Sequence, residues 1–469
     1  MTETDKAAPP NAGGLKRTGK NAFWMVIERV IHLGVAFVVS FIVAGQLGAE
    51  DYGRLAVGMA LMSLLLPISN IIGQCLIRDM AAEPGSAMRV YTAGVVVAGL
   101  VTSVIVLAVG IGVMFTVGLG SDTGIIIMVL VGSSLLRPLN TVDVFFLKRL
   151  ESKRTVKIRI AVGVVLGAAR IGLLLIGFGV TVIAWTYFVE ALLASIGMWV
   201  AFRRVNKDFT WEFNAQRVRT LLKEFTPLFI ASSSALVFMK LDQVMLAALS
   251  SLSETGVFGL GASLAETPRF PLVALLGSLA PRLLALKNRD PELYWAKLAD
   301  VSRLVTLLGL GLTLGLIFVV APLAPLLLPP DYDGISLVIV ILALTTPFAC
   351  LGGILLYVTN WEKLYREAIV RNLVAAGLSV GLNLWLLPRY GAVGAAITTL
   401  IVTIYVYVIG AGLARRTRPV FWLTLPTLEP ISSGRTLWAH RQQSKRERAE
   451  LQKLAAEFSE VDDGPTESR

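Results

Sequence analysis

The fold is constrained most strongly by long apolar stretches that recur along almost the whole chain. A helix needs about 20 apolar residues to cross the hydrocarbon core of a bilayer. Twelve stretches meet this requirement, at 22–47, 54–76, 90–119, 124–147, 160–180, 181–202, 225–249, 255–280, 304–328, 335–358, 367–387 and 391–413. Because backbone groups in lipid must be paired within the spanning structure, each stretch is predicted to be a helix. The sequence therefore predicts an all-α polytopic membrane protein with twelve transmembrane helices.

Charged residues are few and unevenly placed. They make up 16% of the 469 residues, against about 25% in soluble proteins, so the chain has no room for a large soluble domain. Lys and Arg gather in the tails and in alternate loops, at 77–89, 148–159, 203–224, 281–303 and 361–371, whereas the other loops hold only Arg54 and Arg389. Basic loops stay on the cytoplasmic side, so both termini are predicted to be cytoplasmic. Because the bases lie between spans, the net charge of +11 indicates membrane lipids and not nucleic acid as partners.

The two halves of the chain share a weak repeat. A shift of 203 residues superposes Gly53, Gly58 and Leu61 on Gly256, Gly261 and Leu264, and a shift of 212 superposes Arg159 and Gly179 on Arg371 and Gly391. Six spans is an even number, so both halves enter the membrane from the cytoplasm and the repeats are predicted to be parallel. We expect two six-helix bundles around a central cavity.

The repeat gives a predicted domain order. The N-terminal bundle covers 21–203 and the C-terminal bundle 225–414, joined by a cytoplasmic linker at 204–224. Residues 1–20 are predicted to be a disordered cytoplasmic tail. The polar, basic cytoplasmic tail at 415–469 is predicted either to be solvated or to lay an amphipathic helix on the membrane surface.

Prolines mark bends in the predicted spans. Pro67 and Pro271 lie at similar depths in the second and eighth spans, and Pro138 and Pro347 in the fourth and tenth. Because proline removes a helical hydrogen bond, each position is predicted to bend its helix. A hinge for alternating access and a fixed kink both remain open.

The residues on which most enzymes depend are scarce. The chain has two cysteines, Cys75 and Cys350, and two histidines, His32 and His440. It contains no P-loop, GxSxG, HExxH or CxxC motif. We therefore predict no catalytic residue, no metal site and no cofactor, and we do not expect an enzyme.

Charged residues deep inside the spans are the candidate functional residues. The basic ones are Arg137, Arg170, Lys240 and Arg269, and the acidic ones are Asp143, Glu190, Asp242 and Glu266. Each charge costs about 2.5–3.5 kcal/mol at the centre of a membrane helix, so each needs a partner or a polar cavity. Interhelical ion pairs and roles in a transport path remain open for every one of them. We expect several of the eight to line a polar central cavity.

Spacing separates these residues further. Glu266 and Arg269 are three residues apart on one face of a continuous helix, so they can neutralise each other. Lys240 and Asp242 point about 200° apart, so at least one requires a partner on another helix. Amide and aromatic side chains suited to sugar hydroxyls include Asn140, Trp185, Tyr187, Gln243 and Asn383.

The charges also limit the cargo. A guanidinium or ammonium group in a low dielectric favours phosphate. The candidate cargoes are a lipid-linked phosphate, another organic anion, or a cation bound by the acidic residues.

The first span carries a more specific pattern. Asn21, Phe23, Trp24 and Arg29 lead into an apolar run that ends in Leu47-Gly48-Ala49-Glu50-Asp51-Tyr52-Gly53, with a complete LGxxxYG signature at Leu47, Gly48, Tyr52 and Gly53. This opening resembles that of the polysaccharide transporter family, the O-antigen and exopolysaccharide flippases of the multidrug/oligosaccharidyl-lipid/polysaccharide exporter superfamily. The resemblance extends across the chain, because that family has two six-helix bundles around a central cavity.

The resemblance implies a flippase. Such a protein moves an undecaprenyl-diphosphate-linked oligosaccharide across the bacterial inner membrane by alternating access, for exopolysaccharide, O-antigen or capsule biosynthesis. By analogy, Arg137, Arg170, Lys240 and Arg269, chosen for their depth, hold the diphosphate and sugar. Asp143, Glu190, Asp242 and Glu266 are the candidates for binding a coupling proton or sodium ion. Polysaccharide polymerase and assembly proteins are candidate partners.

Two other functions remain open. A cation-coupled multidrug or metabolite antiporter of the related multidrug-extrusion family shares the architecture and binds organic cations through acidic residues. A non-transporting membrane scaffold for polysaccharide assembly would recruit partners through the basic tail. A cavity dominated by acids favours the antiporter and a closed core favours the scaffold, whereas the LGxxxYG signature favours the flippase.

Overall fold

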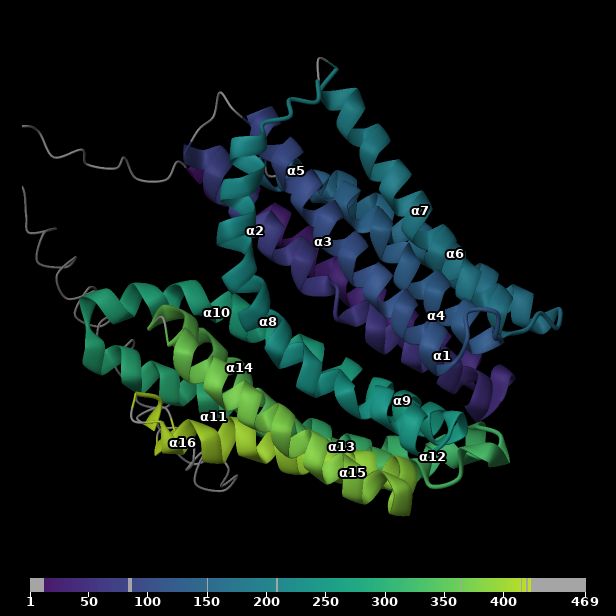
Figure 1. Cartoon of the computed structure of the whole chain (residues 1–469). Helices are drawn as coiled ribbons and strands as arrows, with labels where there is room; N and C mark the ends of the chain where they lie inside the picture. The colour runs from purple at the N-terminus through teal and green to yellow at the C-terminus, as the bar shows by residue number, and fades with distance from the viewer. Residues whose placement is uncertain are drawn as a thin grey trace, which may run out of the picture. The chain divides into compact units, whose positions relative to one another are not determined.

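Helices form the described structure (Figure 1). The computed structural model describes residues 12–82, 87–149, 151–207, 210–362, 364–414, 416–418 and 421–422, and these ranges contain no β-strand. The α-helices are α1 (Ala12–Ser63), α2 (Leu66–Ala82), α3 (Ala87–Thr116), α4 (Asp122–Gly132), α5 (Asp143–Lys148), α6 (Lys153–Leu175), α7 (Val180–Val205), α8 (Ala215–Leu249), α9 (Leu252–Glu266), α10 (Phe270–Arg289), α11 (Pro291–Gly315), α12 (Ala321–Leu327), α13 (Ile335–Ala343), α14 (Thr346–Trp361), α15 (Tyr365–Ile404) and α16 (Gly410–Leu413).

The helices confirm the predicted polytopic fold. Among the described residues, 7 helices are long and apolar enough to cross a membrane, and α13 with α14, bent by 41°, makes an eighth span. Two of the seven, Gly34–Met80 and Arg366–Leu413, contain 47 and 48 residues, about twice what one crossing needs. Each breaks at a glycine with positive φ, at Gly48 (79°) and Gly391 (49°). The predicted seventh span corresponds to α8, and the eighth to α9 followed by α10.

The ends of the chain are described only in part. Helix α1 begins at Ala12, inside the segment predicted to be a disordered tail. Residues 1–11 and almost all of 415–469 lie outside the described residues, so the predictions for these two segments stay predictions.

The helices gather into two compact units. The larger comprises Met1–Pro271, Gly315–Thr345 and Tyr365–Thr403, and the smaller comprises Leu272–Leu314, Thr346–Leu364 and Ile404–Arg469. One part of the core of the larger unit is aromatic: the ring centroids of Tyr91 and Phe145 are 5.1 Å apart, and those of Phe145 and Phe202 are 4.9 Å apart. The boundaries of the two predicted six-helix bundles stay a prediction.

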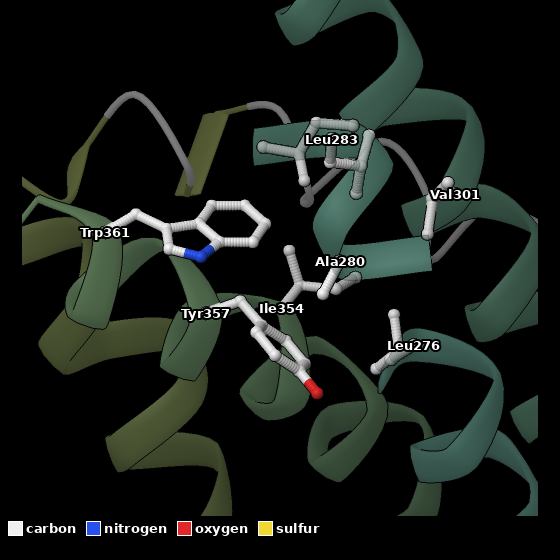
Figure 2. A pocket seen from close by; sticks show the side chains of 8 residues that line it. Leu276, Ala280, Leu283, Val301, Ile354, Tyr357 and Trp361 are labelled. Carbon is white, nitrogen blue, oxygen red and sulfur yellow. The ribbon is translucent and has the colours of Figure 1, made fainter. Parts of the chain in front are cut away.

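The smaller unit packs α10, α11 and α14 around buried apolar side chains. Figure 2 shows the cavity among them, which is lined by Leu276, Ala280, Leu283, Leu298, Val301, Ile354, Tyr357 and Trp361. Its volume is about 10 Å³, the space that one water needs. This cavity is therefore a gap in the packing and too small for a ligand.

The predicted bends occur in both halves of the chain. Breaks or 3-10 segments interrupt the second, fourth, eighth and tenth spans close to their prolines. They lie at 64–65 before Pro67, at Ser133–Val142 around Pro138, at Thr267–Arg269 before Pro271, and at 344–345 before Pro347. The positions of the breaks therefore agree with the repeat, because they occur in the second and fourth spans of each half.

The repeat also has a point of contact inside the larger unit. A Cβ on Gly53 would lie 3.0 Å from the backbone nitrogen of Gly256 and closer still to the carbonyl oxygen of Leu252. Reciprocally, a Cβ on Gly256 would lie 3.0 Å from the nitrogen of Gly53 and closer still to the carbonyl oxygen of Ala49. Ala49 and Leu252 are related by the same shift of 203 as the two glycines. The crossing is thus symmetric, and it requires residues without side chains.

Candidate functional site

Arg170 in α6 is surrounded by one face of α7. Its side chain forms an ion pair with Glu190, and its Nε donates a hydrogen bond to the Thr186 hydroxyl at 2.8 Å. The guanidinium carbon also lies 3.6 Å from the centroid of the Tyr187 ring, a cation–π contact. Arg170 is only 5% exposed. A buried guanidinium with these partners is held firmly in one position.

Arg137 lies within electrostatic range of the same carboxylate, that of Glu190. Arg137 belongs to the 3-10 segment of the fourth span. The Ser195 hydroxyl of α7 holds this segment in place, because it lies within donating distance of the Leu136 carbonyl oxygen (3.2 Å) and of Asn140 Oδ1 (3.1 Å). Within the described part of the chain, no hydrogen bond or ion pair to Arg137 is found. Glu190 is therefore bonded to Arg170 and acts on Arg137 through its charge alone, and the three residues together carry a net positive charge.

Asp143 in α5 belongs to a separate ionic cluster. Its carboxylate accepts a hydrogen bond from Arg159 in α6 at 3.0 Å. The same guanidinium lies 2.6 Å from the carboxylate of Glu28 in α1. This cluster matches the structural interpretation, because one arginine joins the carboxylates of two other helices.

Lys240 in α8 pairs with Glu266 in α9 at 3.5 Å. Arg269 instead donates to the carbonyl oxygen of Leu342 at 3.0 Å and to the Thr345 hydroxyl at 2.6 Å. The predicted pairing of Glu266 with Arg269 is therefore replaced by an interhelical pair. The physical reason is the 3-10 segment Thr267–Arg269, which interrupts the helix between the two residues.

Asp242 in α8 is almost sealed from solvent, at 2% exposure. Its Oδ1 accepts hydrogen bonds from the Ser379 hydroxyl (2.9 Å) and the Asn383 amide (2.7 Å), and its Oδ2 accepts one from the Thr399 hydroxyl (2.6 Å). The buried Oδ1 of Asn383 has no hydrogen-bond partner. The prediction that at least one of Lys240 and Asp242 requires a partner on another helix is confirmed, because the donors to Asp242 all come from α15.

The sequence missed the hydroxyl groups in these clusters. Thr186, Ser379 and Thr399 hold a predicted residue in place, but serine and threonine are frequent in membrane helices and carry no charge that would single them out. Of the aromatic candidates, Tyr187 contacts Arg170, whereas Trp185 is 49% exposed.

The eight predicted residues form separate clusters. Neither the cavity of the smaller unit nor the apolar groove of about 460 Å³ between α3 and α4 is lined by any of them. The ion pairs are not sealed, because the side chains of Glu190 and Glu266 are 22% and 35% exposed. Assembly of these residues around a central cavity remains a prediction.

Solved structures share the fold. Lipid II flippase MurJ in an inward closed conformation matches with a TM-score of 0.66 at 13% identity, over 87% of this chain and 90% of that one. An inward-facing multidrug resistance MATE family transporter of the MOP superfamily matches with a TM-score of 0.63 at 13% identity, over 84% and 98%. The MATE transporter VcmN of Vibrio cholerae matches with a TM-score of 0.58 at 14% identity, over 88% and 98%. At these identities the likeness concerns the fold alone.

Sequence comparison gives the family. No curated protein sequence matches the chain. The profile of one family, described as polysaccharide biosynthesis protein, matches residues 18–287, which is more than half of the chain and includes the LGxxxYG signature. This multi-pass membrane protein, with a fold shared by flippases and MOP-superfamily transporters, therefore belongs to the polysaccharide biosynthesis protein family.

Proposed function

We propose that the protein is a flippase that moves an undecaprenyl-diphosphate-linked oligosaccharide across the bacterial inner membrane for polysaccharide biosynthesis. Its family, and the similarity of its fold to that of a lipid II flippase, support a transporter of lipid-linked sugars. In this proposal both termini are cytoplasmic and the bundles at 21–203 and 225–414 alternate access to a central cavity. Polymerase or assembly proteins then receive the cargo on the outer face.

The excess positive charge around Glu190 carries this proposal. Arg170 is held by Glu190, Thr186 and Tyr187, whereas Arg137 has electrostatic support but no bonded partner among the described residues. A diphosphate supplies the missing negative charge, and guanidinium groups bind phosphate oxygens through paired, charge-assisted hydrogen bonds. Arg137 is therefore assigned the direct phosphate contact.

The remaining basic candidates take supporting roles in this assignment. Arg170 positions the Glu190 carboxylate. Lys240 and Arg269 contact the sugar or phosphate from α8 and from the segment after α9.

Asp242 is the proposed coupling carboxylate. The other acidic candidates, Asp143, Glu190 and Glu266, already have a cationic partner within 4 Å. Among the described residues, Asp242 accepts hydrogen bonds from neutral donors alone, beside the unpartnered oxygen of Asn383. Lys240 lies within electrostatic range of Asp242 but pairs with Glu266. Carboxylate, hydroxyl and amide oxygens are the ligands that a hard cation such as sodium prefers, and a proton on Asp242 is the alternative.

A cation-coupled antiporter is the second candidate, because two MATE transporters share the fold with TM-scores of 0.63 and 0.58. An organic cation would favour a cluster in which acids outnumber bases. The cluster at Glu190 has the opposite balance, which favours the flippase.

Deletion of the encoding gene, complemented by wild-type or variant protein, tests the proposal. We expect the deletion and Arg137→Ala to accumulate the lipid-linked oligosaccharide on the cytoplasmic leaflet and to lose polymer. Mass spectrometry of extracted lipids measures the first and polymer quantification the second. Arg154→Ala is the matched control, because Arg154 is an exposed arginine on the same half of the chain and, among the described residues, pairs with Glu151 alone.

Three outcomes separate the candidates. Accumulation with Arg137→Ala but not with Arg154→Ala supports the flippase. Normal polymer with drug sensitivity supports the antiporter, and lost polymer without accumulated lipid-linked sugar supports a scaffold.

A further inference from the structure

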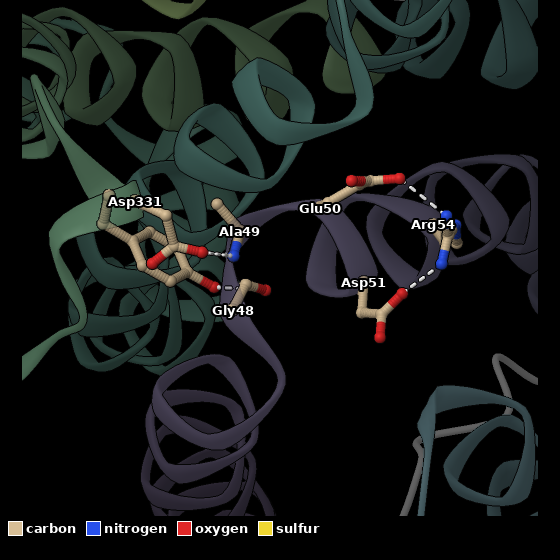
Figure 3. A network of polar contacts seen from close by, with 7 residues as sticks. Gly48, Ala49, Glu50, Asp51, Arg54 and Asp331 are labelled. Atoms are coloured by element: carbon tan, nitrogen blue, oxygen red, sulfur yellow. Dashed lines mark hydrogen bonds and ion pairs between the residues drawn. The ribbon is translucent and has the colours of Figure 1, made fainter.

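The LGxxxYG signature lies at a break between two helical segments of α1 (Figure 3). Gly48 has φ 79° and ψ 171°, a conformation that disfavours residues with a side chain. A Cβ at this position would also lie only 2.7 Å from Oδ2 of Asp331. The first glycine of the signature is therefore required both by the backbone and by a residue far along the chain.

The break leaves backbone groups without helical partners, and the segment Pro330–Tyr332 satisfies them. Oδ2 of Asp331 accepts a hydrogen bond from the Ala49 amide at 2.6 Å. The Tyr332 hydroxyl is within donating distance of the carbonyl oxygens of Ala44 (3.1 Å) and Gly48 (3.2 Å). Burial raises the pKa of Tyr332 well above its usual value, so the hydroxyl keeps the proton that it donates. Asp331 and Tyr332 are called the latch below.

The latch is independent of the nearby ion pairs. Figure 3 shows Asp331 beside the Ala49 backbone, whereas Glu50 and Asp51 point to Arg54 further along the helix. The hydrogen bond from Ala49 is the one found for the Asp331 carboxylate within the described residues. A negative charge at the start of a helix is also favoured by the helix dipole.

The same end of the larger unit carries a second contact between the repeats, the crossing of Gly53 with Gly256. A second broken helix is capped in a similar way: the Ala392 amide, next to the break at Gly391, donates to Oε2 of Glu254 at 2.6 Å. The loops here are acidic and poor in Lys and Arg, which the charge rule assigns to the extracytoplasmic side.

We propose that the latch holds the extracytoplasmic ends of the two repeats together and releases the Gly48 break each time the transport path opens outward. Asp331 and Tyr332 are then positioning residues of the transport cycle, and the inference rests on the proposed alternating-access function. Every latch contact is a hydrogen bond to backbone at an aqueous end of the molecule, so water can replace each one when the ends separate. The LGxxxYG signature supplies both the break that the latch caps and the glycine that allows close approach.

Accessibility of a single cysteine tests the latch in the full chain in cells. The parent protein has Cys75 and Cys350 replaced by alanine and carries one new cysteine, Ala44→Cys. Ala44 is fully buried, and its carbonyl oxygen lies within hydrogen-bonding distance of the Tyr332 hydroxyl. A cysteine at this position therefore reports opening of the latch when it reacts with a membrane-impermeant maleimide.

We expect Asp331→Ala and Tyr332→Phe each to raise the labelling rate about tenfold, because the first loses the charge-assisted hydrogen bond from the Ala49 amide and the second loses the neutral hydrogen bonding of its hydroxyl to backbone carbonyls. Asp331→Asn keeps an acceptor oxygen but loses the negative charge, so its labelling rate is expected to lie between those of the wild type and Asp331→Ala.

Asp333→Ala is the matched control, because the one hydrogen bond found for the Asp333 carboxylate in the described part of the chain comes from the Gly334 amide in its own loop. Equal labelling of the Asp331→Ala, Asp333→Ala and parent proteins would overturn the latch. Membrane insertion of each variant is checked by detergent extraction and size-exclusion chromatography.

A cross-link provides the second test. In the double variant Ala49→Cys/Asp331→Cys, a short bifunctional maleimide that joins the two cysteines is expected to stop the transport that remains in the same protein before treatment. Transport by the cross-linked protein at the rate before treatment would overturn the latch. Failure of the flippase proposal would give a different result: Asp331→Ala would still raise the labelling rate of the cysteine at position 44, but no variant would accumulate lipid-linked sugar.

Discussion

Gly53 and Gly256 meet backbone to backbone, and the carbonyl oxygens of Leu252 and Ala49 fill the space that a side chain on Gly53 or Gly256 would occupy. We predict that Gly53→Ala lowers the free energy of unfolding by about 3 kcal/mol or more, because the added methyl group forces two rigid backbones apart. Thermal unfolding in detergent measures the change. Gly99→Ala is the control, since a Cβ on Gly99 meets nothing within 4 Å, and alanine there is expected to stabilise the helix by about 1 kcal/mol. Equal melting temperatures for the two variants would contradict the crossing.

Alanine substitutions of Arg137 and Arg170 should distinguish an effect on cargo binding from an effect on the stability of the fold. Arg170→Ala leaves Glu190 without its bonded partner and is predicted to cost about 3–5 kcal/mol of unfolding free energy. Arg137→Ala removes no bonded partner and is predicted to change stability by about 0.5 kcal/mol or less, although it abolishes transport. Denaturation of both purified variants checks the contrast. A larger loss of stability for Arg137→Ala than for Arg170→Ala would show that Arg137 is mainly structural.

Asp242→Asn should remove a stabilising effect of the coupling ion. A ligand that binds only the folded state stabilises it by about 2.7 kcal/mol at 100 times its dissociation constant. If sodium is the ion, the wild type is predicted to melt at a higher temperature in sodium than in potassium at equal ionic strength, and Asp242→Asn is predicted to show no difference. Asp122→Asn, at an exposed carboxylate in the first turn of α4, keeps the response. An unchanged sodium response in Asp242→Asn would place the ion elsewhere.

Gly48→Ala and Gly118→Ala form a matched pair, because their φ angles are 79° and 84°. Positive φ costs a residue with a side chain about 1–3 kcal/mol, and a Cβ on Gly118 meets nothing else within 4 Å. Gly48→Ala also pushes against Asp331, so it is predicted to be the more destabilising of the two. Adding Asp331→Ala should recover part of this difference in a double-mutant cycle measured by thermal unfolding. Strict additivity would argue against the contact.

The all-helical, multi-span architecture was the most predictable level of structure, because the length of an apolar stretch is set by the bilayer and not by the rest of the fold. Helices α6 and α7 match the predicted spans at 160–180 and 181–202, allowing for basic ends that reach out of the apolar region. Gly179 and Gly391, paired by the repeat, both separate helices. The disposition of the predicted bundles stays a prediction.

Side-chain partners were less predictable, since they depend on breaks and on contacts distant in sequence. The pairing of Glu266 with Arg269 assumed a continuous helix, and the 3-10 segment containing Pro268 removes the assumed geometry. The donors to Asp242 lie more than 130 residues further along the chain, and no local pattern around them signals a shared carboxylate. Asp331 likewise acts on a motif 282 residues away.

The reciprocal crossing at positions 203 residues apart has an evolutionary consequence. If the halves arose by duplication of a six-helix ancestor, the ancestral glycine would have met its own copy on the twofold axis of a homodimer. A change at that position would have altered both sides of the junction at once. Fusion into a single polypeptide released this constraint, so that each side can now acquire a mutation that the other compensates.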